Sequence, residues 1–303
     1  MRALVISGGG SKGAFAGGVA EYLLNEAKKD YNLYLGTSTG SLLISHLALG
    51  KIEKVKHIYT NVKQSDIFSL NPFVTKRKGD REYVTINYLN TVLQFIKRKR
   101  TFGESKNLRK TIVNHFSINE FEAIKRSEKE VIVTVSNLTK NKVEYKSIYD
   151  FNYEDFVDWI WISCNLVPFM SLSTKNNFEY ADGGLGRMVP IREAIRRGAT
   201  EVDAIILEAE NMEHNKVLGR NPFSLMMNLF GFMLDQVEKQ DIREGKLASI
   251  QRNVQLNLYY TPSRLTENSL IFDKQLMSEW WQQGFKYAQS KGEDNRFDYD
   301  TDK

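Results

Sequence analysis

Short apolar runs and longer amphipathic stretches alternate along the 303-residue chain. An apolar run of a few residues predicts a buried strand, whereas apolar residues three and four positions apart predict a helix. Strands are predicted at 3–7, 33–35, 131–135, 178–181, 202–207 and 254–260, with an alternating edge strand at 143–148. Helices are predicted at 13–24, 41–49, 84–96, 156–164, 191–197, 222–245 and 272–289.

The order of these elements indicates the class of fold. At the N-terminus a strand, a glycine turn and a helix follow one another twice, which is typical of a wound α/β domain. We therefore predict a single α/β domain over residues 1–290, with a mostly parallel central sheet flanked by helices. Within it, residues 51–130 are predicted to form a variable basic insertion. The polar tail at 291–303 is predicted to be frayed.

Composition indicates the class of protein and the compartment in which it works. Hydrophobic residues make up 42% of the chain and charged residues 26%, as in an ordinary globular protein. Cys164 is the one cysteine, so no intrachain disulfide can form, which fits a reducing compartment. The first apolar run is too short for a signal peptide, and no stretch approaches the roughly 20 apolar residues of a membrane span. We therefore expect a cytoplasmic protein.

Positive charge is concentrated in one part of the chain. The net charge is +5, but residues 51–110 hold fifteen Lys and Arg against five Asp and Glu, which leaves that segment at +10 and the remainder at −5. Such an excess suits an anionic surface, either phospholipid headgroups or nucleic acid. It is also typical of a solvated insertion with long basic side chains.

Three glycine-containing motifs each follow a predicted strand, and in a parallel sheet all three would lie at the carboxyl edge, where binding crevices form. The first motif is Gly8-Gly9-Gly10-Ser11-Lys12-Gly13. Its N–H groups precede a helix, so the loop suits a phosphate or the oxyanion of an acyl intermediate. Gly8, Gly10 and Gly13 also match the dinucleotide fingerprint, but the second strand ends without the acidic residue that this fingerprint requires.

The second motif has the G-x-S-x-G form of a nucleophile elbow. It reads Gly36-Thr37-Ser38-Thr39-Gly40 and joins a predicted strand to a predicted helix. Small residues on both sides of the serine allow the sharp turn that projects its Oγ above the sheet. Taken alone, the same pattern is also typical of a glycine turn with a helix-capping serine.

The third motif is Asp182-Gly183-Gly184, at the end of the predicted strand 178–181. An aspartate at a strand end can lie close to the elbow, although an Asp-Gly turn is common in any protein.

Together, the glycine-rich loop, the serine elbow and the distant Asp-Gly-Gly resemble the patatin-like phospholipases. The resemblance extends to the segment 167–169, which reads Val-Pro-Phe, and to the helix at 190–194 with the Gly-Ala turn at 198–199. It covers residues 1–50 and 160–210. Many members of the family have Asp-Gly-Ala at the third motif, and Lys12 stands where a basic residue is common.

The resemblance implies a three-layer α/β/α lipid acyl hydrolase with a Ser–Asp dyad. Ser38 would be the nucleophile, Asp182 would be its base, and the loop from Gly8 to Gly13 would stabilise the oxyanion. The implied substrate is a phospholipid or another acyl-ester lipid, with no metal and no cofactor. We accordingly expect no nucleic acid partner, and we consider segment 51–110 a candidate for peripheral membrane contact.

Several alternatives remain open at this stage. The loop from Gly8 to Gly13 would hold a pyrophosphate in a nucleotide-binding protein, and the basic segment would serve a non-catalytic binder of anionic surfaces. His214 follows Asp182 in the chain order of a Ser-His-Asp triad, although its surroundings predict a polar loop. The apolar run at 223–234 would suit an acyl channel or a bilayer contact, but we favour a core helix packed with methionines. Trp280 and Trp281 are predicted to anchor the C-terminal helix.

Overall fold

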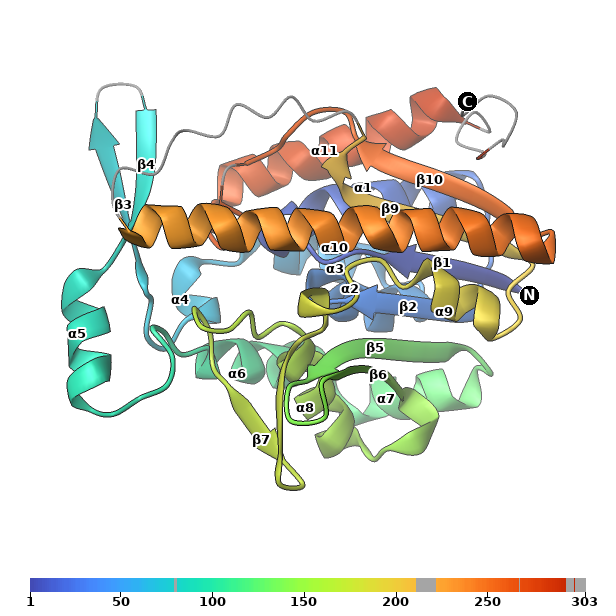
Figure 1. The fold of residues 1–303 in the computed structure, drawn as a ribbon. Helices are drawn as coiled ribbons and strands as arrows, with labels where there is room; N and C mark the ends of the chain where they lie inside the picture. The colour runs from blue at the N-terminus through green and yellow to red at the C-terminus, as the bar shows by residue number, and fades with distance from the viewer. Residues whose placement is uncertain (79–80, 211–221, 267, 293–296, 298–303) are drawn as a thin grey trace.

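The computed structural model describes residues 1–78, 81–210, 222–266, 268–292 and Phe297, and its centre is a mixed sheet (Figure 1). The sheet consists of β1 (Arg2–Ile6), β2 (Leu33–Thr37), β5 (Glu130–Asn137), β6 (Lys142–Ser147), β7 (Ser173–Lys175), β8 (Phe178–Asp182), β9 (Glu201–Ala209) and β10 (Gln255–Thr261). The strand order is β10-β9-β1-β2-β5-β8-β7, and β6 also pairs with β5.

Strand direction changes at β5. The strands β10, β9, β1, β2 and β5 are parallel, whereas β6 and β8 run antiparallel to β5. The expectation that the Asp-Gly-Gly motif ends a parallel strand is therefore wrong. Register brings it to the site instead, because Thr37 is paired with Thr134 and Asp182 with the next residue of β5, Val135.

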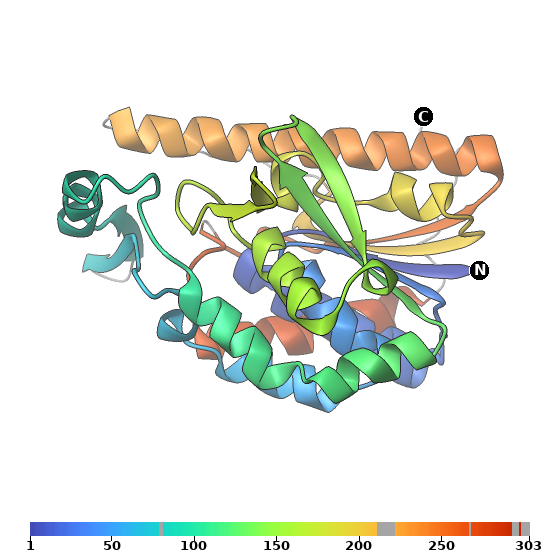
Figure 2. The same cartoon turned by 90° about the horizontal axis from the view of Figure 1, so that it is seen from below.

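Helices cover both faces of the sheet and form three layers (Figures 1 and 2). One face carries α1 (Gly13–Glu21), α2 (Thr39–Ala48), α3 (Ile52–Asn61), α4 (Gln64–Ile67), α6 (Lys106–His115), α7 (Ile118–Arg126), α8 (Tyr153–Ser163) and α11 (Lys274–Lys291). The other face carries α9 (Ile191–Arg196) and α10 (Pro222–Arg252). The short elements are η1 (Gly10–Lys12), the π-helical η2 (Tyr22–Glu26), η3 (Ile148–Asp150) and η4 (Gly183–Leu185).

The alternation of side chains along β1 explains the two helical layers. Leu4 and Ile6 are buried under α1 and α2, whereas Ala3 and Val5 are buried on the face that α9 covers. Successive side chains of a strand point to opposite faces, so a strand that is apolar throughout needs cover on both sides. The predicted α/β class with a mostly parallel sheet is confirmed.

The segment after α4 differs most from the expectation. Its strands β3 (Phe73–Lys78) and β4 (Arg81–Ile86) form a separate antiparallel hairpin, and α5 is limited to Tyr88–Ile96. The helix predicted at 84–96 is therefore wrong at its start. The side chain of Asn87 accepts a hydrogen bond from the N–H of Asn90 and caps α5, so the chain before it remains a strand. The helices α3, α4, α6 and α7 were not predicted.

Two further differences concern α10. It continues to Arg252 because Gly245 serves close packing rather than termination: a Cβ there would lie 2.7 Å from Cγ2 of Ile191 on α9. Its first half is not the buried core helix that we favoured, since several of its large apolar side chains are exposed. These are Leu225, Met226, Leu229, Phe232 and Met233.

The remaining expectations concern the C-terminal part. Trp280 and Trp281 are buried, which confirms them as anchors of α11. Most of the tail at 291–303 lies outside the described residues, although Phe297 donates its N–H to the Leu256 carbonyl. Within the described ranges, no helix combines the length and the hydropathy needed to cross a bilayer.

The contact between α1 and α11 generates a stability prediction. A Cβ on Gly284 would overlap the carbonyl oxygen of Phe15, so the two backbones require glycine there. Gly284→Ala is expected to lower the free energy of unfolding by about 1–3 kcal/mol, although alanine favours helices intrinsically. Gln275→Ala, at an exposed position of α11, serves as the control and should stay within about 0.5 kcal/mol. Equal denaturant midpoints for the two variants would contradict the close contact.

Candidate active site

Ser38 occupies a strained turn between β2 and α2. Its backbone has φ 52° and ψ −121°, a conformation that non-glycine residues rarely adopt. A Cβ on Gly36 would overlap the backbone of Gly40, and a Cβ on Gly40 would overlap the Ile6 carbonyl. The two motif glycines are therefore needed for close approach, and the turn has the geometry of a nucleophile elbow.

Side chains from α2 and from the end of α8 hold this turn in place. The Ser38 N–H donates to Ser163 Oγ at 3.0 Å, and the Cys164 thiol donates to the Ser38 carbonyl at 3.1 Å. Ser163 Oγ donates in turn to the Thr134 carbonyl on β5 at 2.7 Å. Ser41 Oγ donates to the Gly36 carbonyl at 2.9 Å. Sequence reasoning missed Ser41, Ser163 and Cys164, because no motif marks a serine or a cysteine that supports a turn.

Asp182 ends β8 and is 3% exposed. Its Oδ1 accepts the N–H of Gly184 at 2.7 Å, and the Ser38 side chain lies near enough to its carboxylate to favour the ionised form. Burial raises the pKa of this carboxyl to about 7, although the Ser38 side chain and the Gly184 N–H act in the opposite direction. The structure therefore brings Ser38 and Asp182 together, as the sequence predicted.

The glycine-rich loop lies beside this pair. The N–H groups of Gly8 and Ser11 donate to the carbonyls of Met188 and Ser269, at 3.2 and 2.8 Å, and that of Lys12 donates to Gly9 at 3.1 Å. Among the described residues, the N–H groups of Gly9 and Gly10 have no such acceptor. Gly10 has φ +55°, and a Cβ there would overlap the Ser269 carbonyl, so the loop follows this path only with glycine.

Lys12 is not a free cation at the site. Its side chain is buried and forms an ion pair with Glu208, at the end of β9. Glu238 on α10 is also buried nearby, where burial first and Glu208 second raise its pKa to about 8. The loop thus faces carboxyl groups as well as a lysine, a feature that the sequence did not reveal.

Ser38 lies at the boundary of two pockets. A polar pocket contains Asp182, Gly8, Gly9, Gly10, Lys12, Glu208, Asp235 and Glu238. An apolar pocket lies on the other side of Ser38, and its apolar lining includes Leu42, Val55, Ile112, Phe116, Ile160 and Met277. A group bound at Ser38 therefore has a polar region on one side and an apolar one on the other.

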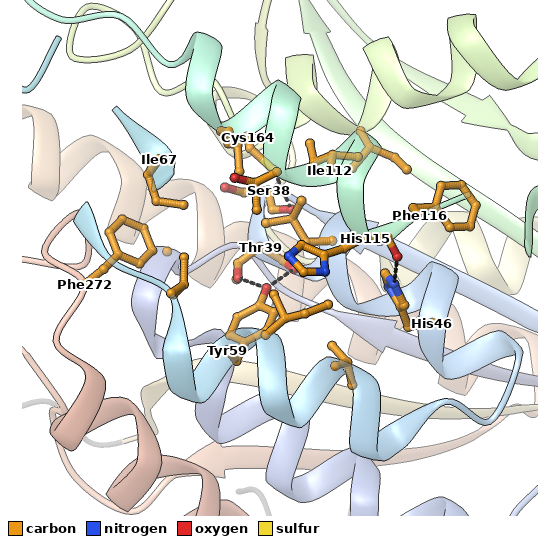
Figure 3. A pocket seen from close by; sticks show the side chains of 18 of the residues that line it. Ser38, Thr39, His46, Tyr59, Ile67, Ile112, His115, Phe116, Cys164 and Phe272 are labelled. Carbon is orange, nitrogen blue, oxygen red and sulfur yellow. Dashed lines mark hydrogen bonds between the residues drawn. The ribbon is translucent and has the colours of Figure 1, made fainter. Parts of the chain in front are cut away.

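Figure 3 shows hydrogen bonds that polar side chains form in the lining of the apolar pocket. The Tyr59 hydroxyl lies 2.7 Å from Thr39 Oγ1, and His46 Nε2 donates to the His115 carbonyl at 2.9 Å. Burial lowers the pKa of His46, and burial followed by nearby Lys54 lowers that of His115, so both rings are held neutral. The lining therefore presents no charge to a hydrocarbon chain.

Among the described residues, no hydrogen bond joins a histidine to Ser38 or Asp182. His46 and His115 line the apolar pocket that Ser38 also lines, where the His46 ring donates to the His115 carbonyl, and His57 on α3 lies near Asn61. His214, the alternative base, lies outside the described residues. Within those residues, no group of His, Cys, Asp and Glu has the arrangement of a metal site.

The site thus combines a sharp elbow serine with a buried carboxylate in an α/β protein with a mostly parallel sheet. The family model of the patatin-like phospholipases matches residues 4–195. The chain belongs to the patatin-like phospholipase family, and it is accordingly a lipid acyl hydrolase with a lipid substrate.

Among solved structures, the chain is similar to VipD from Legionella pneumophila, at a TM-score of 0.51 and 14% sequence identity. The match covers 98% of this chain and 68% of VipD, and at this identity it shows a shared fold. No curated protein matches the sequence.

The burial of Asp182 generates a prediction about stability. Its folded pKa is raised above its unfolded value of about 3.8, so the stability it contributes is present below pH 4 and is lost as pH rises towards 7. Asp182→Asn should therefore raise the free energy of unfolding relative to the wild type by about 2–4 kcal/mol at pH 8 and by little at pH 4.

Melting curves at a series of pH values test this difference. Asp150→Asn, at an exposed position, is the control and should follow the wild type throughout. A difference between Asp182→Asn and wild type that does not grow between pH 4 and 7 would show that the carboxyl is not held protonated by burial.

Proposed function

We propose that the protein is a phospholipase A-type hydrolase that cleaves carboxylic esters through a Ser38–Asp182 dyad and an acyl-enzyme. One observation supports this most directly: Ser38 lies beside Asp182 in one pocket, and burial raises the pKa of this carboxyl to about 7. A serine hydroxyl needs an adjacent base, and a carboxylate with a near-neutral pKa is a far better base than one at the usual value.

The proposed reaction has two stages. Asp182 takes the Ser38 proton as Oγ attacks the ester carbonyl, and then gives that proton to the leaving alcohol. In the second stage Asp182 takes a proton from water, the hydroxide attacks the acyl-enzyme, and the fatty acid leaves as Ser38 regains its proton.

The N–H groups of Gly9 and Gly10 are the best candidates for stabilising the oxyanion. Both belong to the loop beside Ser38, and neither donates to a described carbonyl. The Ser11 N–H is less suited, because it already donates to Ser269. Gly8, Lys12 and Gly13 would then shape the loop: a Cβ on Gly8 would lie 2.5 Å from Met188 Sδ, and one on Gly13 would overlap Thr39.

The two pockets support a lipid ester as substrate. The uncharged apolar pocket suits the acyl chain, and the polar pocket suits the glycerol and headgroup side of the leaving group. A pyrophosphate at the glycine loop would meet the carboxyl groups of Glu208, Asp235 and Glu238, which disfavours the nucleotide-binding alternative. A non-catalytic anionic-surface binder would leave the strained turn at Ser38 without a role.

We also propose that the enzyme works in the cytoplasm and contacts a membrane peripherally through segment 51–110. The basic excess of that segment supports this, because anionic headgroups attract clustered Lys and Arg.

Substitution of either dyad residue tests the mechanism. Ser38→Ala and Asp182→Asn should each reduce kcat for a fluorogenic short-chain ester by about 10³-fold or more, with folding intact. Ser45→Ala, at a buried serine of α2 beside the apolar pocket, is the control and should retain most activity. Retention of activity by Asp182→Asn would refute the dyad, and a histidine would then be the candidate base.

The pH profile tests the role of Asp182 independently. Because the carboxyl must be ionised to act as base, kcat/KM for a soluble ester should rise about tenfold per pH unit below about 7 and level off above it. A profile that is flat from pH 5 to 8 would mean that the working base has an ordinary carboxyl pKa. Stopped assays in buffers of constant ionic strength measure this.

A further inference from the structure

Helix α5 presents apolar side chains to solvent over most of its length. Its exposed residues are Tyr88, Leu89, Val92, Leu93, Phe95 and Ile96, of which Leu89 is 80% and Ile96 72% exposed. These positions cover a broad face of a nine-residue helix. Such a concentration of exposed large apolar groups marks an interaction surface rather than ordinary scatter.

The first half of α10 has a second exposed apolar stripe. Leu225, Met226, Leu229, Phe232 and Met233 are all exposed, and their three- and four-residue spacing places them along one face. Later in the same helix, exposed apolar residues are interspersed with charged ones.

A chain of phenylalanine contacts joins the two helices. Phe95 of α5 lies 6.2 Å from Phe102, Phe102 lies 6.0 Å from Phe169, and Phe169 lies 5.7 Å from Phe230 of α10, all between ring centroids. Phe169 is buried, so it forms the base on which the exposed parts of both helices rest.

The same contacts connect this region to the site. Phe169 belongs to the loop after α8, in which Leu166 lines the polar pocket and Met170 lines the apolar pocket. In Figures 1 and 2, α5 and the start of α10 lie at the end of the molecule towards which β1 and β2 run. Ser38 follows β2, so the apolar region and the pockets lie at the same end.

Positive charge borders the apolar residues of α5. Lys97 and Arg98 directly follow the helix and are exposed, and no described residue pairs with either of them. Lys99 and Arg100, by contrast, form ion pairs with Glu104 and Glu179. An apolar helix with free cations at its border matches the interface of an anionic bilayer, where acyl chains lie beneath negative headgroups.

We propose that α5 and the first half of α10 form a docking surface that inserts into the interface of an anionic lipid bilayer and sets Ser38 against its substrate. This inference rests on the proposed function for the identity of the substrate, but the docking step itself needs no catalysis. Insertion buries the exposed apolar side chains, and Lys97 and Arg98 contact phosphate groups.

The experiment separates docking from chemistry. Binding is measured by co-sedimentation of the intact chain carrying Ser38→Ala with vesicles of phosphatidylcholine alone and with phosphatidylglycerol added, at low and high salt. Into this background are introduced Leu89→Ser with Ile96→Ser on α5, Leu229→Ser with Phe232→Ser on α10, and Lys97→Gln with Arg98→Gln. The control variants are Leu247→Ser and Lys239→Gln, at exposed positions in the later part of α10.

Each apolar pair should weaken binding to anionic vesicles by at least about tenfold. The charge pair should weaken it by about fivefold or more per cation at low salt and by little at high salt. Both controls should bind like the parent. In the active enzyme, the apolar variants should lose vesicle hydrolysis while retaining short-chain ester hydrolysis.

Other results overturn the inference in distinguishable ways. Unchanged vesicle binding in the apolar variants would show that the surface does not insert. A change in sedimentation velocity from a dimer to a monomer on Leu89→Ser with Ile96→Ser, without a change in vesicle binding, would assign the surface to a second copy of the chain. Vesicle binding that follows the predictions, with no ester hydrolysis by the enzyme, would refute the proposed function and leave docking supported.

Discussion

The arrangement of the site depends on one sharp turn, in which a non-glycine residue is held at φ 52°. Such a conformation is unfavourable by about 1–3 kcal/mol and persists only where its surroundings impose it. Here β1 approaches Gly40, Ser163 accepts the Ser38 N–H, and the Cys164 thiol binds the Ser38 carbonyl. Because Ser163 is also bonded to β5, the sheet and α8 fix the position of Ser38 together.

The site also depends on the exclusion of water from Asp182. A carboxyl at this position would have an ordinary pKa if water reached it, and its near-neutral value arises first from burial. Burial follows from register, since β8 pairs back along β5 until Asp182 stands opposite Val135. Gly183 then lies so close to the Thr134 backbone that a Cβ would overlap it. The raised pKa of Asp182 is thus a consequence of strand pairing.

The parts of the structure that local sequence encodes were predictable. The apolar runs predicted the strands β1, β2, β5 and β9. The placement of the glycines and the family resemblance predicted the three motifs and the pairing of Ser38 with Asp182. The direction of β8 could not be predicted, because the sequence of a short strand does not show whether it pairs parallel or antiparallel. Nor could the Lys12–Glu208 ion pair, which joins residues 196 positions apart. In segment 51–130 the helices α3, α4, α6 and α7 were missed because their apolar stripes are short and separated by basic residues. The exposure of α10 was misjudged because an apolar helix has the same sequence whether a core or a lipid covers it.

The two pockets differ in polarity, so they distinguish the two ends of a bound ester, which a single uniform cleft would not. In the proposed reaction the acyl chain of an ester has a favourable place only on the side of Ser38 lined by Leu42, Ile112 and Met277, since transfer of its methylenes from water there is favoured by about 0.8 kcal/mol each. The opposite side presents ionisable groups, against which a hydrocarbon chain would leave polar atoms unsatisfied. The orientation of the ester carbonyl is therefore set by the surroundings of both the acyl chain and the alcohol part. Asp182 and Gly9 line the polar pocket, where in the proposed reaction the alcohol departs and takes up its proton, whereas Gly10 lines both pockets, at the boundary where the ester carbonyl oxygen would become negatively charged.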